Sequence, residues 1–437
     1  EKNLYGMPNA ARGWGQCRDE FILSRFNQSG WRCARTLMDP CLYVVDKYVG
    51  EGKGQLNHPI WKGTKDKFPA MDPKFDGLDP TKASSSYIRS YMLIHTDDVD
   101  AYGQDLAVLH EINNAMNAEW KTKLVDEKFI LGVQRDVDKN PDGWTVKVSM
   151  PNYIDDLYNS FQPLMKEMKC HKVPPRPFPE GVILTKAHTP VDGEVDRNIK
   201  RGYQRLVGSL LWCVRHVSPI SQYGCSQLCK LMACPTDKAM EAALKMLGYL
   251  HAHRNEGIVF RETDASPICF VDASNKDDPS DGKTQYGFHV HWGGPVAWKS
   301  SKLQHVGLNS TYNEYMALTH AIKHVYWTRQ LLEGMGLAYL IQEPSLIHAD
   351  NKQANTLCAE DLVTNGNMYF RTHYHYNKEA VRDKYVIVQW IDTSENISDT
   401  MTKGLGNVKL KQFEPTLHGH EEINPDLLRR RKGPLEV

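Results

Sequence analysis

The chain has 437 residues, which is enough for two or three domains. Its 53 Lys+Arg and 53 Asp+Glu residues balance, which excludes a global positive field, so any contact with nucleic acid needs local basic patches. An apolar run of membrane-spanning length and a signal-peptide core are both absent from the sequence, so we expect an intracellular protein, cytoplasmic or nuclear, with no membrane partner. The chain opens without Met, and we interpret it as a piece of a longer protein.

The first 162 residues are expected to mix helices and strands around an insertion. Apolar spacing predicts a helix over 12–26 and a strand over 42–45. Residues 50–86 are rich in Gly, Lys, Asp and Pro and poor in apolar side chains, which indicates a surface insertion or loop.

A second strand, over 91–94, leads directly into a pair of acidic residues. Asp97 and Asp98 follow this apolar strand, and a helix is predicted over 105–120. Strands over 129–133 and 144–148 are expected to pair around a turn. Asp97 and Asp98 end a strand of buried character, which favours a catalytic turn. The alternative interpretation is a solvated acidic turn.

The middle of the chain is predicted to be helical. An amphipathic helix over 153–161 precedes a Pro-rich linker over 163–195, and three helices are expected over 198–217, 219–232 and 236–253. The helix over 219–232 carries Cys225 and Cys229, and Cys234 follows it. Their spacing lacks a C-x-x-C pair, which favours core cysteines over a zinc site.

From residue 267 the pattern predicts strand, hairpin, helix, strand, helix, loop, strand and helix. Three antiparallel strands followed by helix-linked ones make a mixed sheet with helices packed on it. Four acidic residues stand where these elements begin or end, namely Asp272, Glu314, Asp350 and Asp399. Carboxylates that separate elements bring to one edge suit two divalent cations such as Mg²⁺.

Each of these four acids also has a plain structural explanation. Glu314 completes a capping box that starts at Thr311, and Asp350 is a candidate helix N-cap. Asp272 would then lie in a turn, and Asp399 would be a surface acid. A set of caps does not require all four acids in this order, whereas a two-metal site does, so we favour the metal site.

The same stretches resemble the ribonuclease H domain of copia-type retrotransposon Pol polyproteins over about residues 265–405. The resemblance implies that Asp272, Glu314, Asp350 and Asp399 hold two Mg²⁺ or Mn²⁺ ions. It also implies substrate contacts at Ser301, Lys302, Asn351 and His375, the last within a His-rich segment that departs from the family pattern. The matching segments are 270–274, 298–302, 309–318, 349–354 and 396–403.

The upstream half resembles the reverse transcriptase of the same polyproteins, at residues 4–14, 39–43 and 203–211. The resemblance implies that Asp97 and Asp98 are metal-binding residues of the polymerase, although His95 stands where the family has Tyr. The strand that carries the family's third catalytic Asp is missing from this chain. We therefore predict no independent polymerase activity.

Basic side chains near the acidic quartet are candidates for a phosphate track, and each is also explained as a solvated surface charge. They are Lys299, Lys302, His305, Arg371, His373 and Lys378. The run 429–432 is either a nucleic-acid or nuclear-targeting patch or a disordered tail.

The predicted organisation is a truncated reverse transcriptase palm over 1–162, a linker and helical thumb-like region over 163–263, a ribonuclease H domain over 264–405, and a tail over 406–437. The expected fold class is mixed α+β, with a five-stranded mixed sheet and flanking helices in the ribonuclease H domain. The expected activity is hydrolysis of RNA in RNA–DNA hybrids. Its partners would be the hybrid, a template–primer and the rest of the Pol and Gag polyprotein. Two alternatives stay open, a decayed relic without catalysis and a co-opted nucleic-acid-binding or interaction module.

Overall fold

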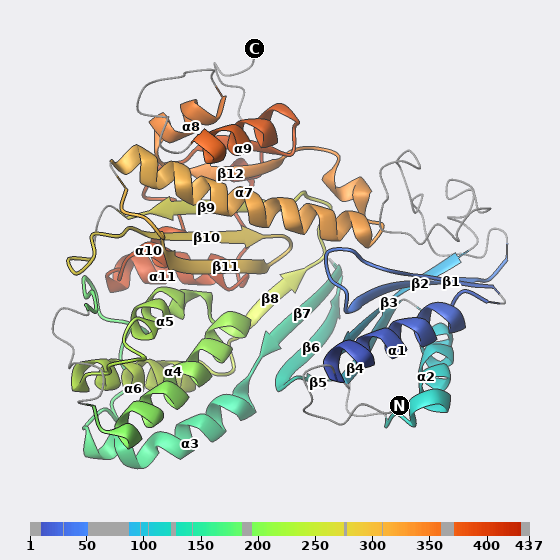
Figure 1. Cartoon of the computed structure of the whole chain (residues 1–437), viewed down its shortest axis with the longest axis horizontal. Coiled ribbons are helices and arrows are strands. Elements are labelled where there is room, and N and C mark those ends of the chain that lie inside the picture. The colour runs from blue at the N-terminus through green and yellow to red at the C-terminus, as the bar shows by residue number, and fades with distance from the viewer. Residues whose placement is uncertain are drawn as a thin grey trace. The chain divides into compact units, whose positions relative to one another are not determined.

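A computed structural model describes most of the chain (Figure 1). The predicted insertion, Asp97 and the basic residues 430–432 lie outside the described residues. The chain divides into two compact units, one made of Glu1–Leu131 with Trp327–Gln342 and the other of Gly132–Tyr326 with Glu343–Val437. No helix in the described part is both long and apolar enough to cross a membrane. The described residues are 10–28, 30–50, 87–96, 98–103, 105–123, 128–141, 143–185, 195–274, 278–307, 309–359 and 371–429.

The first unit is a four-stranded antiparallel sheet with two helices. The predicted helices and both strands are observed, and β1 and β4 are additional strands that the sequence did not predict. Asp105 starts the second helix, because its carboxylate accepts hydrogen bonds from the N–H groups of Ala107 and Val108. The elements are α1 (Ala10–Arg25), β1 (Trp31–Arg35), β2 (Leu42–Tyr48), β3 (Tyr87–His95), β4 (Asp98–Gly103), α2 (Leu106–Trp120), β5 (Phe129–Ile130) and the 3₁₀ turn η6 (Ala338–Ile341).

A buried ion-pair network lies inside this first unit. The Arg89 guanidinium donates to both carboxylate oxygens of Asp46 at 2.8 and 2.9 Å, and Arg32 Nε donates to Asp46 at 2.8 Å. Burial opposes ionisation of Asp46, but the two guanidinium groups outweigh it and lower the pKa of that carboxyl. Arg89 and Tyr91 also donate to the carbonyl oxygen of Met335, at 3.2 and 3.1 Å. The segment Trp327–Gln342 is therefore fastened to β3.

The second unit begins with a small antiparallel sheet and a group of helices. A short strand, β5, lies within the predicted range 129–133, but the strand that pairs with β7 across the turn is β6, with Val137 opposite Val146. The predicted helices are observed, and Tyr203, Leu210 and Cys213 are fully buried among them. The elements are β6 (Val133–Asn140), β7 (Gly143–Ser149), α3 (Pro151–Glu167), α4 (Arg197–Val217), η5 (Pro219–Ser221), α5 (Gln222–Cys229), α6 (Asp237–Ala252) and β8 (Ile258–Arg261).

The interpretation of the cysteines is consistent with this core. All ten cysteines are free, and Cys225 is buried, whereas Cys229 and Cys234 are partly exposed. No cysteine in the described part belongs to a group of side chains able to hold a metal ion.

The remainder of the second unit is the predicted five-stranded mixed sheet. Its order is β11-β10-β9-β12-β13, in which β9, β10 and β11 are antiparallel and β12 runs parallel to both β9 and β13. The helices α9 and α11 are additional to the prediction. The elements are β9 (Ile268–Ala273), β10 (Gln285–His291), β11 (Pro295–Lys302), α7 (Ser310–Gly334), β12 (Ser345–Ala349), α8 (Lys352–Ala359), α9 (Arg371–Arg382), β13 (Val386–Trp390), α10 (Asp399–Thr402), α11 (Asn407–Leu417) and η8 (Pro425–Leu427).

Helices cover both faces of this sheet. Strand alternation sends Val271 and Phe288 into one core, where α7 lies along the strands (Figure 1), and sends Phe270 into a second core. This second core also contains Phe413 and Leu417 from α11, so part of the expected tail is packed structure. The residue after Val271 is Asp272, which therefore faces the second core at the carboxyl end of β9.

Candidate metal centre

Three of the four predicted acids converge at one edge of the mixed sheet. One carboxylate oxygen from each of Asp272, Glu314 and Asp350 lies within 4.8 Å of the other two. Strands β9 and β12 are parallel neighbours with Ala349 opposite Val271, so the next residue on each strand reaches the same edge. Glu314 comes from the start of α7. The strand order predicted from the sequence thus produces the convergence that we expected.

The competing explanation of Glu314 as part of a capping box is wrong. The cap of α7 is Asn309, whose side-chain oxygen accepts the N–H of Tyr312 at 2.8 Å. The Thr311 hydroxyl instead donates to the side chain of Gln353 at 2.8 Å. The Glu314 carboxylate accepts a hydrogen bond from the backbone of Ala273, so it points at the end of β9.

Asp350 is not a helix cap either. Asn351 takes that position, because its side-chain oxygen accepts the N–H of Ala354 at 3.0 Å at the start of α8. The Asp350 carboxylate accepts a hydrogen bond from the hydroxyl of Thr393 at 2.8 Å. It is therefore held toward the acidic cluster by a residue that the sequence did not single out.

Burial and mutual repulsion make two of the carboxylates hard to ionise. Asp272 is 3% exposed, and its burial, together with repulsion from Asp399 and Asp350, raises its pKa to about 7. Burial also raises the pKa of Glu314 well above its usual range, with further repulsion from Asp272 and Asp350. A bound divalent cation would relieve this cost, since it compensates several carboxylates at once.

Asp399 stands beside this cluster. It is only 1% exposed, which excludes the surface-acid interpretation, and it begins α10 as predicted. Its carboxylate pairs with Lys403 Nζ at 2.8 Å and closely with Lys409. Lys403 Nζ is also 3.9 Å from Asp272. Lys403 thus lies between the fourth acid and the other three. Burial lowers the pKa of Lys403, but the carboxylates outweigh burial and raise that pKa.

Two further residues that we did not predict organise the site. The Thr402 hydroxyl forms a close hydrogen bond to the Asp272 carboxylate. The Asn396 side chain donates to the carbonyl oxygen of Val271 at 3.0 Å, which ties the segment before α10 to β9. Both residues lie in the stretch 396–403 that carries the family resemblance, so its sequence was the only available signal.

The predicted substrate contacts do not form one constellation with the acids. Lys302 Nζ pairs with Asp278 at 2.5 Å and with Asp281 at 2.8 Å, so its charge is already compensated. Ser301 is next to it at the end of β11, and His375 is exposed on α9. These assignments remain predictions.

The polymerase acids belong to the first unit. Strands β3 and β4 form a hairpin in which His95 pairs with Asp98, and Thr96 adopts a positive φ of 56° in the turn. Asp98 is exposed at the tip. Asp97 lies outside the described residues, so the pair itself is not described.

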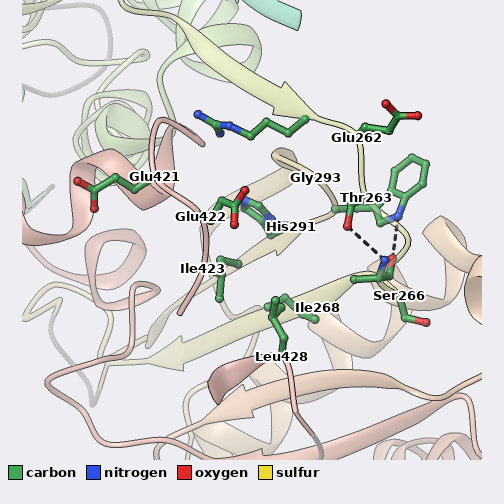
Figure 2. A pocket seen from close by; sticks show the side chains of 13 residues that line it. Glu262, Thr263, Ser266, Ile268, His291, Gly293, Glu421, Glu422, Ile423 and Leu428 are labelled. Atoms are coloured by element: carbon green, nitrogen blue, oxygen red, sulfur yellow. Dashed lines mark hydrogen bonds between the residues drawn. The ribbon is translucent and has the colours of Figure 1, made fainter. Parts of the chain in front are cut away.

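One further group in the described part has metal-ligand character, formed by His253, Glu256 and Glu414. A separate cavity of about 240 Å³ lies at the opposite end of β9, where Ile268 and His291 line it (Figure 2). Glu421 and Glu422 also line this cavity. Its acidic lining does not suit a polyanion, so the carboxylate cluster remains the best candidate site.

Comparison with known proteins gives Pol polyproteins of plant transposons and, over 29% of this chain, a secreted RxLR effector protein of Plasmopara viticola at 28% identity. The chain is 25% identical over 326 residues to the retrovirus-related Pol polyprotein from transposon RE1 of Arabidopsis thaliana, covering 74% of this chain and 21% of that polyprotein. It is 23% identical over 405 residues to the Pol polyprotein from transposon TNT 1-94 of Nicotiana tabacum, covering 92% and 26%. The chain thus spans about a quarter or less of the Pol polyproteins that it matches. No protein-family model matches it.

Solved structures give weaker likenesses. The chain resembles ribonuclease H1 of Halobacterium salinarum with a TM-score of 0.24 and 15% identity, covering 33% of this chain and 98% of that one. It resembles a foamy viral protease–reverse transcriptase, solved with an RNA/DNA hybrid, with a TM-score of 0.37 and 12% identity, covering 69% and 36%. The sequence relatives carry the assignment: the homologues of this chain are the retrovirus-related Pol polyproteins of plant transposons.

Proposed function

We propose that this chain is a fragment of a copia-type Pol polyprotein whose second unit hydrolyses the RNA strand of RNA–DNA hybrids. The observation that carries the proposal is the convergence of Asp272, Glu314 and Asp350 from three separate elements into one buried cluster. Sequence similarity to Pol polyproteins supports the polyprotein context. The products would be a 3′-hydroxyl and a 5′-phosphate end.

The donor set suits hard divalent cations. All the converging groups are carboxylates, which Mg²⁺ and Mn²⁺ prefer, and neither histidine nor cysteine belongs to the cluster. Burial, followed by repulsion between the carboxylates, raises the pKa values of Asp272 and Glu314, and Lys403 offsets only part of this rise. Two bound ions would supply an activated water and stabilise the leaving 3′ oxygen of the phosphodiester.

The chain's own residues orient the carboxylates for this task. Thr402 fixes Asp272, Thr393 fixes Asp350, and the backbone of Ala273 fixes Glu314. Such hydrogen bonds to ligand groups hold them in one orientation and tune their basicity. We assign the fourth carboxylate, Asp399, to the second ion, which requires Lys403 to turn away from it. The Lys403 side chain is 45% exposed, so that movement opens no buried space.

We propose no independent polymerase activity for the first unit, because His95 stands where the resemblance expects Tyr and Asp98 is exposed at the tip of the hairpin. Binding of a template–primer, and assembly with the rest of the Pol and Gag polyprotein, remain proposals on the same basis.

The test is hybrid cleavage by the Asp350→Asn variant, with Asp383→Asn as a control, because Asp383 is a surface acid paired with Arg382 on the same unit. We expect Asp350→Asn to abolish Mg²⁺-dependent cleavage and to weaken Mn²⁺ binding in calorimetry, while the control retains both. Undiminished cleavage by Asp350→Asn would contradict the assignment. Hybrid binding without cleavage by the wild type would favour the alternative of a decayed relic or co-opted binding module.

A further inference from the structure

A group of basic side chains from five parts of the second unit gathers on and beside α7. It consists of Arg215 at the end of α4, Lys299 on β11, His305 after β11, His320 and Lys323 on α7, and His373 on α9. We infer that this group, called here the basic surface, holds the phosphate backbone of the hybrid duplex next to the carboxylate cluster. The inference rests on the proposed function and specifies where the substrate lies.

The members of the basic surface are close enough to repel one another. Lys299 lies within electrostatic reach of Arg215, and His320 within reach of Lys299, Lys323 and His373. Burial, followed by this repulsion, lowers the pKa of His320 to about 4 and lowers the pKa of Lys299. His320 is therefore uncharged at neutral pH, and the positive charge of the basic surface comes from Arg215, Lys299 and Lys323.

No carboxylate within the described ranges forms an ion pair with any member of the basic surface. Four lysines elsewhere in the same unit are paired with carboxylates. Lys230 and Lys302 share Asp278, and Lys403 and Lys409 share Asp399. The charges of these four ammonium groups are therefore compensated, whereas the basic surface is open to an external anion.

The position of the basic surface along α7 relates it to the carboxylate cluster. His320 and Lys323 follow Glu314 by six and nine residues, which corresponds to about 9 and 14 Å along a helix. Lys299 adjoins Ser300, which lies opposite Gly287, and Gly287 lies opposite Asp272. Two strand spacings amount to roughly 10 Å. A duplex bound at the carboxylates would have to extend about this far to reach these cations, and Lys323 stands on the opposite side of α7 from Glu314, because nine residues make about two and a half helical turns.

The chemistry of the surface favours a duplex over a single strand. Single-strand sites stack bases on exposed aromatic rings. The aromatic ring at the centre of this surface, Tyr286, is 3% exposed and is covered by the His320 ring at 4.3 Å. Tyr286 therefore offers no open face to a base. The basic members of the surface suit a backbone that is recognised by its shape and not by its sequence.

The experiment uses charge reversal in the full chain, with Asp350→Asn as the common background so that binding is measured without cleavage. Lys299→Glu and Lys323→Glu are combined, and Lys411→Glu serves as the matched control, because Lys411 is an exposed lysine on α11, against the other face of the sheet. Binding of a labelled RNA–DNA hybrid is followed by fluorescence anisotropy at several salt concentrations. Lys323→Glu alone is included because Lys323 is exposed, so folding is preserved if Lys299→Glu proves disruptive.

We expect the double variant to weaken hybrid binding about tenfold or more at roughly 50 mM salt, and to reduce the slope of log K against log salt by about 2, since each lost phosphate contact contributes about 0.9. Lys323→Glu alone should show about half of that reduction in slope. Lys411→Glu should match the parent in both affinity and slope. Equal affinities and slopes in all variants would overturn the inference.

A second measurement separates failure of this inference from failure of the proposed function. In the cleaving chain, reversal at Lys299 and Lys323 should raise KM and leave kcat at saturating hybrid unchanged. Cleavage with an unchanged KM would reject the basic surface and leave the ribonuclease assignment standing. Salt-dependent binding through these lysines in a chain that does not cleave would retain the basic surface and reject the ribonuclease assignment.

Discussion

Neutralising Asp272 should stabilise the metal-free protein, which is an unusual outcome for the loss of a buried ionisable residue. Burial and repulsion raise the pKa of this carboxyl from 3.8 to about 7. Each pKa unit is worth about 1.36 kcal/mol, so ionised Asp272 costs the folded state up to about 4 kcal/mol above neutral pH. Asp272→Asn removes that charge but weakens the contacts with Thr402 and Lys403. A net gain of about 1–4 kcal/mol is expected.

The assay is urea unfolding in a chelating buffer at about pH 8, where the wild type carries the charge. The control is Asp278→Asn, the same substitution at another buried acid. Asp278 pairs with Lys230 and Lys302, which lower its pKa, so its removal should destabilise the fold. The carboxylate cluster therefore predicts changes of opposite sign in the free energy of unfolding, a gain for Asp272→Asn and a loss for Asp278→Asn.

The pH dependence has a definite sign. Between the unfolded value near 4 and the folded value near 7, folded Asp272 binds a proton that the unfolded chain has lost. Wild-type stability should therefore rise as pH falls through this window, and the advantage of Asp272→Asn should disappear toward about pH 4. Mg²⁺ should stabilise the wild type and not the variant. A variant no more stable than the wild type at about pH 8, alongside a destabilised Asp278→Asn, would refute this electrostatic account.

Two more outcomes follow from the contacts described above. Thr402→Val should raise the Mg²⁺ concentration needed for hybrid cleavage about tenfold, because Asp272 loses its orienting hydroxyl. Thr402→Ser keeps a hydroxyl and should leave the Mg²⁺ dependence unchanged. Equal shifts in both variants would assign the effect to packing. Arg89→Met should destabilise the first unit by about 3 kcal/mol in urea unfolding, because Asp46 keeps only Arg32, and an unchanged midpoint would exclude a structural role for this network.

The elements with regular apolar spacing were predictable from the sequence. The helices α2 and α7 follow from it directly, since each buries one continuous face, and the strand β9 follows from a short apolar run that is buried on both faces. The helix α9 is mostly polar, and the strand β6 reads Val-Gln-Arg-Asp-Val-Asp-Lys-Asn, so neither shows a clear periodic pattern. Their structure depends on neighbours that are distant in the sequence, which local patterns do not record.

The candidate site was likewise predictable from the sequence only in part. Parallel pairing of β9 and β12 makes the approach of Asp272 and Asp350 a consequence of strand order, and strand order was predictable. The roles of Asn309 and Asn351 were missed, because the Thr311–Glu314 spacing and the acid Asp350 both match cap patterns that the nearby asparagines fulfil instead. Sequence patterns gave no distances, so they could not place Asp399 behind two lysines.

The first unit is discontinuous in the chain, and this affects the order in which the protein can be made and divided. Arg89 and Tyr91 hydrogen bond to Met335, which is synthesised more than two hundred residues later. During translation the sheet of the first unit must wait, with these donors unsatisfied, until the segment Trp327–Gln342 leaves the ribosome. A cut after residue 131 or residue 263 would remove that segment from its sheet. The two units are therefore best expressed, and inherited, as one piece.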